Sequence, residues 1–149
     1  MAGKTDVFEL DTLKLIFNGT AIANIADNAA ASPLTDLYLS LHTADPTDAA
    51  ASGQSTNETT YTGYARVAVA RTSGGWTCST TGGVSTAVPT ANISFGQCTA
   101  GTATITHVGI GTSASGVGKL LFSGALSPAI AVSSGVVPQI TTASTITED

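Results

Sequence analysis

The residues best suited to chemistry in this chain are two histidines and ten acidic side chains. His42 lies shortly before Asp45 and Asp48, and a histidine with two carboxylates is a set that can bind a divalent cation. Pro46 turns the chain within this set, so we do not expect the three side chains to converge on one ion. We interpret His42 as a histidine at the end of a strand, and we predict no metal site and no cofactor.

His107 alternates with Ile105 and Gly109 along an expected strand. As a general base it would need a nucleophile and an orienting acid beside it. No carboxylate occurs between Glu58 and Glu148, so an active site would have to be assembled from the N-terminal third of the chain. Paired carboxylates for glycoside hydrolysis stay open, because such partners need not be close in sequence. We nevertheless predict a protein without catalytic residues.

The composition excludes several classes of partner. The 149 residues suit one domain, and only 10% of them are charged. The net charge of −5 and the five scattered Lys and Arg residues argue against binding to nucleic acid. There is no apolar run long enough to cross a membrane, and the first residues lack the apolar core of a signal peptide. Cys78 and Cys98 are expected to be reduced, buried thiols, or one disulfide if they face each other on paired strands.

The hydrophobic pattern predicts one helix followed by short strands. Asp6 and Glu9 have the spacing of a capping box, apolar residues then recur at helical spacing, and Asn18-Gly19 is a typical stop, which together predict a helix over 7–17. Alternation and turn residues predict strands at these positions: 37–42, 64–72, from 74 onward, 93–95, 102–112, 119–125, 130–133 and 136–142. Residues 47–62 are expected to form a long exposed loop.

The spacing of these strands predicts a mainly β fold. We expect an antiparallel β-sandwich or barrel, jelly-roll-like, with about seven to nine short strands and a short N-terminal helix. The chain is expected to be a single domain over 1–149. Within it, residues 1–35 would form a helix and arm that packs on neighbouring chains or swaps to them, and residues 36–149 would form the β body.

Four segments, read in order, resemble a family of small tailed-phage virion proteins. They are Leu37–Pro46 (LYLSLHTADP), Tyr61–Val69 (YTGYARVAV), Thr106–Ile110 (THVGI) and Leu120–Leu126 (LLFSGAL). Proteins of this family are labelled either tail-fibre-like or capsid cement proteins. The resemblance spans nearly the whole chain and implies a structural role without catalysis.

We therefore predict a capsid cement or decoration protein, assembled in the host cytoplasm and located in the virion on the capsid surface. It would bind the major capsid protein and stabilise contacts between capsid subunits, as a homo-oligomer with a trimer favoured. The candidate interface residues are Phe8, Leu10, Leu13, Phe17, Tyr61 and Tyr64. Core packing is the alternative interpretation for Leu13 and Phe17.

Two other functions stay open at this stage. The first is a tail fibre or tail-associated protein that contacts a host receptor, with Trp76, Tyr61 and Tyr64 as candidates for stacking on sugars. The second is an enzyme such as a cell-wall hydrolase, against which the acid-free stretch after Glu58 argues.

Overall fold

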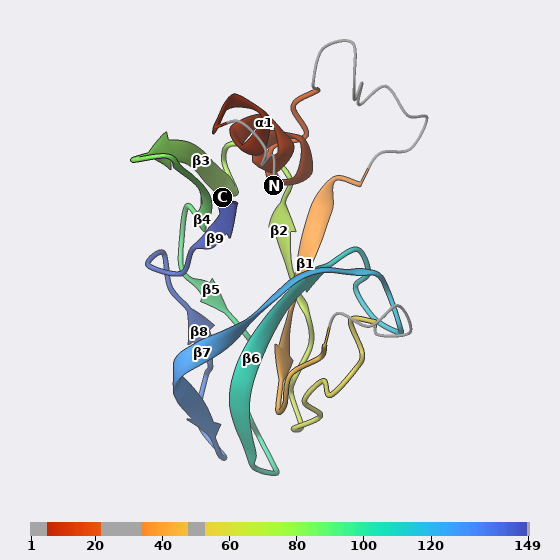
Figure 1. Cartoon of the computed structure of the whole chain (residues 1–149). Coiled ribbons are helices and arrows are strands. Elements are labelled where there is room, and N and C mark those ends of the chain that lie inside the picture. Colours follow the sequence, from red (N-terminus) through yellow and green to blue (C-terminus); the bar gives the residue numbers. More distant parts are fainter. Residues whose placement is uncertain (1–5, 22–33, 48–52, 149) are drawn as a thin grey trace. The chain divides into compact units, whose positions relative to one another are not determined.

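The structure is a computed structural model that describes residues 6–21, 34–47 and 53–148 (Figure 1). Within these ranges the chain has one helix and nine strands. In chain order they are α1 (Asp6–Phe17), β1 (Asp36–His42), β2 (Val67–Ala70), β3 (Trp76–Thr81), β4 (Val84–Pro89), β5 (Ile93–Ser94), β6 (Ala103–Gly111), β7 (Leu120–Val132), β8 (Gln139–Ile140) and β9 (Ile146–Glu148). The predicted mainly β, antiparallel fold with a short N-terminal helix is confirmed.

The chain folds into two compact units built from interleaved stretches. Unit 1 combines Met1–Asp36, Ala70–Asn92 and Thr141–Asp149. Unit 2 combines Leu37–Val69 and Ile93–Ile140. Each unit has its own buried apolar residues, among them Trp76 in unit 1 and Ile105 in unit 2.

Helix α1 packs on the sheet of unit 1. Leu13 and Phe17, which are one helical turn apart, are fully buried, and the Phe17 ring lies 4.6 Å from the Trp76 ring between centroids. The helix ends where expected, because Gly19 adopts a left-handed φ of 63° and the Thr20 amide donates to the Lys14 carbonyl.

The sheet of unit 1 has the order β3-β4-β9. Gly82 and Gly83 make the turn between β3 and β4, both with a positive φ that other residues rarely adopt. Strand β9 was not predicted, because Ile146–Glu148 holds a single apolar residue and gives no alternation.

Unit 2 contains a four-stranded sheet in the order β2-β1-β6-β7 and the small pair β5-β8. In Figure 1, β6 and β7 run side by side along most of their length. The strands expected at 119–125 and 130–133 form one long strand, β7, whose register shifts at Thr106: this one residue of β6 lies opposite Leu126–Ala129. This bulge contains Pro128, which cannot donate a backbone hydrogen bond.

Two expectations about loops and strands are corrected. The strand expected over 64–72 begins only at Val67. The segment expected to be an exposed loop is partly buried: Gln54 is 0%, Thr59 3% and Tyr61 5% exposed. The Gln54 side chain donates to the Tyr38 carbonyl and the Thr59 amide donates to the Leu41 carbonyl, both in β1, and composition alone does not reveal these contacts. Both Cys78 and Cys98 are free thiols, and burial raises the pKa of Cys78.

Candidate functional site

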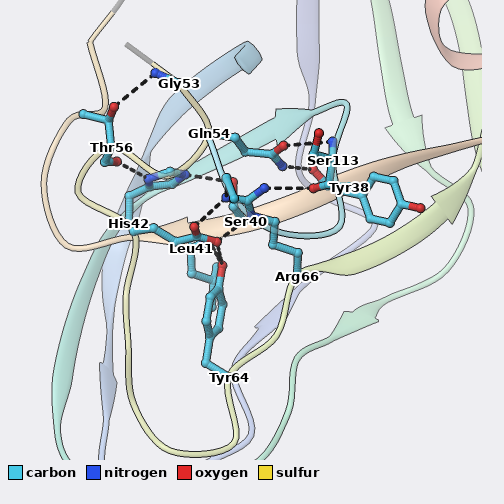
Figure 2. Close-up of polar contacts among 12 residues, drawn as sticks. Tyr38, Ser40, Leu41, His42, Gly53, Gln54, Thr56, Tyr64, Arg66 and Ser113 are labelled. Atoms are coloured by element: carbon cyan, nitrogen blue, oxygen red, sulfur yellow. Dashed lines mark hydrogen bonds and ion pairs between the residues drawn. The ribbon is translucent and has the colours of Figure 1, made fainter. Parts of the chain in front are cut away.

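Eight residues of unit 2 form a polar cluster beside the end of β1 (Figure 2). We define the polar cluster by the residues Ser40, His42, Gln54, Thr56, Glu58, Tyr64, Arg66 and Ser113. Strand β1 contributes Ser40 and His42, and the chain between β1 and β2 contributes the next five. Ser113 opens the turn between β6 and β7.

His42 is the centre of the polar cluster and has no exposed surface. Its Nδ1 lies 2.8 Å from the Thr56 carbonyl oxygen, and its Nε2 lies 2.9 Å from Ser40 Oγ. A carbonyl only accepts hydrogen bonds, so Nδ1 carries the proton and Nε2 accepts from the Ser40 hydroxyl. Burial lowers the pKa of His42, because the charged imidazolium would lose its hydration. The ring is therefore neutral at neutral pH.

The Ser40–His42 contact has the distance of a nucleophile and its general base. Two features separate it from a catalytic pair. The third position is a backbone carbonyl where an orienting carboxylate would be needed, and both side chains are 0% exposed. A substrate cannot reach Ser40 Oγ in this arrangement. The pair instead holds the segment that contains Thr56 against β1.

Two glycines of β6 make room for the polar cluster. A Cβ atom on Gly109 would lie 2.6 Å from His42 Nε2 and 2.8 Å from Ser40 Oγ. A Cβ atom on Gly111 would clash with Gln54 Oε1. Alternate residues of a strand share one face, so the Gly109-Ile110-Gly111 sequence opens a space on the side that holds His42 and Gln54.

Glu58 and Arg66 form a two-point ion pair. Arg66 Nη2 lies 2.6 Å from Glu58 Oε2, and Arg66 Nε lies 2.7 Å from Glu58 Oε1. The Arg66 side chain is 2% and the Glu58 side chain 15% exposed, so the pair is shielded from water. The hydrogen bonds with Glu58 raise the pKa of Arg66.

Tyr64 completes this arrangement. Its hydroxyl donates to Glu58 Oε1 at 2.6 Å and accepts the Leu41 amide at 3.1 Å. Burial, followed by the hydrogen bond to Glu58, raises the pKa of Tyr64. Tyr64 therefore links the ion pair to the backbone of β1.

The same groups fasten the turn between β6 and β7. Arg66 donates to the carbonyl oxygens of Ser113 and Gly116, at 2.9 Å and 2.6 Å. Gln54 donates to the Tyr38 carbonyl at 2.6 Å and accepts the Ser113 amide at 3.3 Å. The polar cluster thus ties two loops to one end of the sheet and leaves Val117, 69% exposed, at the surface of the turn.

The structure places the predicted interface residues in both units. Leu13 and Phe17 are fully buried in unit 1, and Leu10 of the same helix is half-buried. Phe8 belongs to α1, but its side chain lies outside the described part. In unit 2, Tyr61 is buried and donates to the Gly96 carbonyl at 2.9 Å, and Tyr64 lies in the polar cluster. Contact of any of these residues with a neighbouring chain stays a prediction.

The candidates for stacking on sugars are corrected. Trp76 is 1% and Tyr61 5% exposed, so neither ring face is open to a ligand. Both rings pack on other aromatic side chains, Trp76 on Phe17 and Tyr61 on Tyr64. An alternating strand pattern does not distinguish an aromatic anchor of the core from an exposed platform.

Sequence reasoning did not find the roles of Gln54, Glu58 and Arg66. Two signals were present. Glu58 is the last acid before a long acid-free stretch, and Arg66 follows it on the outward face of an expected strand. A single acid and a single base with small neutral residues around them are candidates for a buried pair. Asp48, considered for a metal site, lies outside the described residues.

Within residues 6–21, 34–47 and 53–148, no group of three or more His, Cys, Asp or Glu side chains could hold a metal ion. The single helix there falls short of the length and apolar character needed to cross a membrane.

Comparison with known protein families gives a match over nearly the whole chain. The family model described as "Podophage GP4 fiber I protein gp80" matches residues 6–147. A search of curated proteins finds none that matches. The family match confirms the resemblance to tailed-phage virion proteins that four sequence segments indicated.

Proposed function

Because the chain belongs to the family of the podophage GP4 fiber I protein gp80, we propose that it is a structural subunit of a tail fibre in a tailed-phage virion. The observation that carries this proposal is the extent of the match, residues 6–147, which includes elements of both units. Membership of this family also supports the more general conclusion that the chain is a phage virion structural protein.

The family's description as a fiber protein favours a fibre over capsid cement. The sequence segments alone were compatible with both. A role as cement bound to the major capsid protein at the capsid surface is therefore the second candidate.

The polar cluster supports a structural role more than a catalytic one. Its ionic groups bind one another and backbone carbonyls, and its serine–histidine pair is closed to substrates. What the cluster achieves is a rigid junction between two loops and a sheet. A rigid loop presents its surface with little loss of conformational entropy on binding.

We propose further that the chain acts as a homo-oligomer, with a trimer favoured. Few charged and many small residues give surfaces that pack closely without burying unpaired charge. Native mass spectrometry of the purified chain gives the number of subunits directly, and a monomer at micromolar concentration would contradict this part of the proposal.

The experiment that tests the fibre proposal is a copy count in purified virions. Quantitative mass spectrometry measures this chain relative to the major capsid protein. A handful of copies per virion is expected for a tail fibre. A ratio near one would overturn the fibre proposal and support cement on the capsid shell.

A further inference from the structure

A second property of the polar cluster concerns the segment that closes over His42. Residues Gly53–Thr59 lie along β1 and are held by the side-chain contacts of Gln54 and Glu58 described above and by further hydrogen bonds to the end of β1. The Thr59 amide donates to the Leu41 carbonyl at 2.9 Å, and the Thr43 amide donates to the Asn57 carbonyl at 2.9 Å. His42, which lies between Leu41 and Thr43, adds a third contact through the bond from its Nδ1 to the Thr56 carbonyl.

Thr56 also stabilises the turn at the start of this segment. Thr56 accepts the Gly53 amide on its side-chain hydroxyl, at 3.1 Å. The carbonyl and the hydroxyl of Thr56 thus join His42 to the start of the segment. Loss of the His42 bond to the Thr56 carbonyl would therefore remove one of the contacts that hold the segment Gly53–Thr59 on β1.

The surroundings of His42 are unfavourable to a positive charge. Across the sheet, the register places His107 of β6 directly opposite His42. The positive charge of Arg66 also disfavours a second positive charge on the His42 ring. Glu58 is the acid that faces His42, and Arg66 and Tyr64 already bind its carboxylate oxygens.

Protonation would also disturb the hydrogen bonds of the ring. In the neutral state Nε2 accepts from Ser40 Oγ. Once Nε2 carries a proton it must donate to that oxygen, so the Ser40 hydroxyl proton has to turn to another acceptor. A buried charge and a displaced donor together favour movement of the ring toward water.

We propose that His42 is an acid-sensitive latch: protonation of its ring releases the segment Gly53–Thr59 from β1 while the four-stranded sheet stays folded. The turn between β6 and β7 loosens with it, because the Gln54 and Ser55 amides donate to the Gly118 and Val117 carbonyls. This inference rests on the geometry of unit 2 and is independent of where in the virion the chain is located.

The direction of the pH dependence follows from the environment of the ring. The closed form binds a proton on His42 less readily than the open form, because burial lowers the pKa below its usual value of 6.5. The closed state is therefore favoured above pH 6.5 and loses up to tenfold in its ratio to the open state for each pH unit below that value, until the pKa of the closed form is reached.

Hydrogen exchange followed by mass spectrometry on the full chain tests this proposal. Peptides covering 53–60 and 103–111 are compared between pH 7.5 and 5.0, after correction for the intrinsic exchange rate, and the lower limit stays above the calculated isoelectric point of 4.6. We expect protection to fall with pH in the first peptide and to stay constant in the second. Equal loss in both would overturn the proposal, because the sheet would then open as a whole.

Two variants assign the effect to one histidine. His42→Asn keeps a donor that can reach the Thr56 carbonyl and does not titrate, so the pH dependence of the peptide 53–60 should vanish. His107→Asn is the matched control, and the pH dependence should persist. A persisting dependence in His42→Asn would overturn the proposal.

A measurement on the unmodified chain covers the case in which His42→Asn fails to fold. The titration of the His42 ring, followed by its NMR resonances, should have its midpoint in the pH range where the peptide 53–60 loses protection. A ring that stays neutral after the segment has opened would contradict the latch.

Discussion

At the residue scale, unit 2 depends on residues that lack a side chain. Gly109 and Gly111 provide the space in which His42, Ser40 and Gln54 form their hydrogen bonds. Both glycines are visible in the sequence, and the register of β6 against β7 shifts between Ile110 and Gly111. The sequence did not show what fills the space, because the partners come from β1 and from a segment expected to be exposed.

Replacing Gly109 by alanine tests this interpretation. The new Cβ would lie within 2.6 Å of His42 Nε2, so we expect Gly109→Ala to lower the free energy of unfolding by about 1–3 kcal/mol. The matched control is Gly124→Ala on β7, where a Cβ meets nothing within 4 Å and a change below about 1 kcal/mol is expected. Chemical denaturation measures both. Equal effects of the two variants would mean that crowding of the polar cluster is not the cause.

At the element scale, helix α1 shows what a pattern predicts and what it misses. Helical spacing and the Asn18-Gly19 stop predicted its existence and its end at Phe17. They did not predict that Arg71, distant in the chain, binds its C-terminus. Arg71 donates to the Ile16 carbonyl at 2.6 Å, to the Leu34 carbonyl at 3.2 Å, and to the Leu15 carbonyl. A cation at this end satisfies free carbonyls and opposes the negative end of the helix dipole.

Removal of this charge should weaken the end of α1. We expect Arg71→Met to lower the stability of unit 1 by about 1–3 kcal/mol, because charge-assisted hydrogen bonds to the helix end are lost. Arg71→Lys should recover part of it, since the charge stays but the planar donor set does not. Hydrogen exchange of the Asn18 and Thr20 amides, which donate to Lys14, reports the fraying. Full stability in Arg71→Met would show that the cap is dispensable.

For the strands too, the sequence pattern predicted some features and missed others. Alternating Leu37, Leu39 and Leu41 predicted β1 accurately, because one face of this strand is apolar over its whole length. Strand β7 was predicted in two pieces, since neither the bulge nor its continuation past Pro128 has a local signature. Which distant segments pair with one another is the feature of a β fold that is hardest to predict from a single sequence.

At the scale of the whole molecule, the two units are made from stretches that alternate along the chain. The first stretch of unit 1 ends at Asp36. The later stretches, Ala70–Asn92 and Thr141–Asp149, carry no shift in composition that marks them. The family, by contrast, could be recognised from the sequence, because the resemblance depends on four motifs in a fixed order and not on contacts between distant residues.

Trp76 allows the two units to be followed separately. It is the one tryptophan of the chain and packs on Phe17 in unit 1. We expect Phe17→Ala to cost unit 1 about 3–5 kcal/mol and to move the denaturation transition of Trp76 fluorescence to lower denaturant. Peptides of β6, in unit 2, should keep their protection from hydrogen exchange at the same denaturant concentration. Simultaneous loss of both signals would mean that the units unfold as one.

The bulge on β7 bears on how copies of this chain can meet. Within the described residues β7 is an outer strand of its sheet, and the stretch from Leu120 to Thr147 has no charged side chain to repel an identical strand. Long, neutral outer strands recruit strands from other molecules and seed amyloid-like aggregates. The bulge at Leu126–Ala129 interrupts the row of backbone donors and acceptors, and Pro128 removes one donor. At high concentration, copies of this chain are therefore less prone to join their sheets edge to edge through β7.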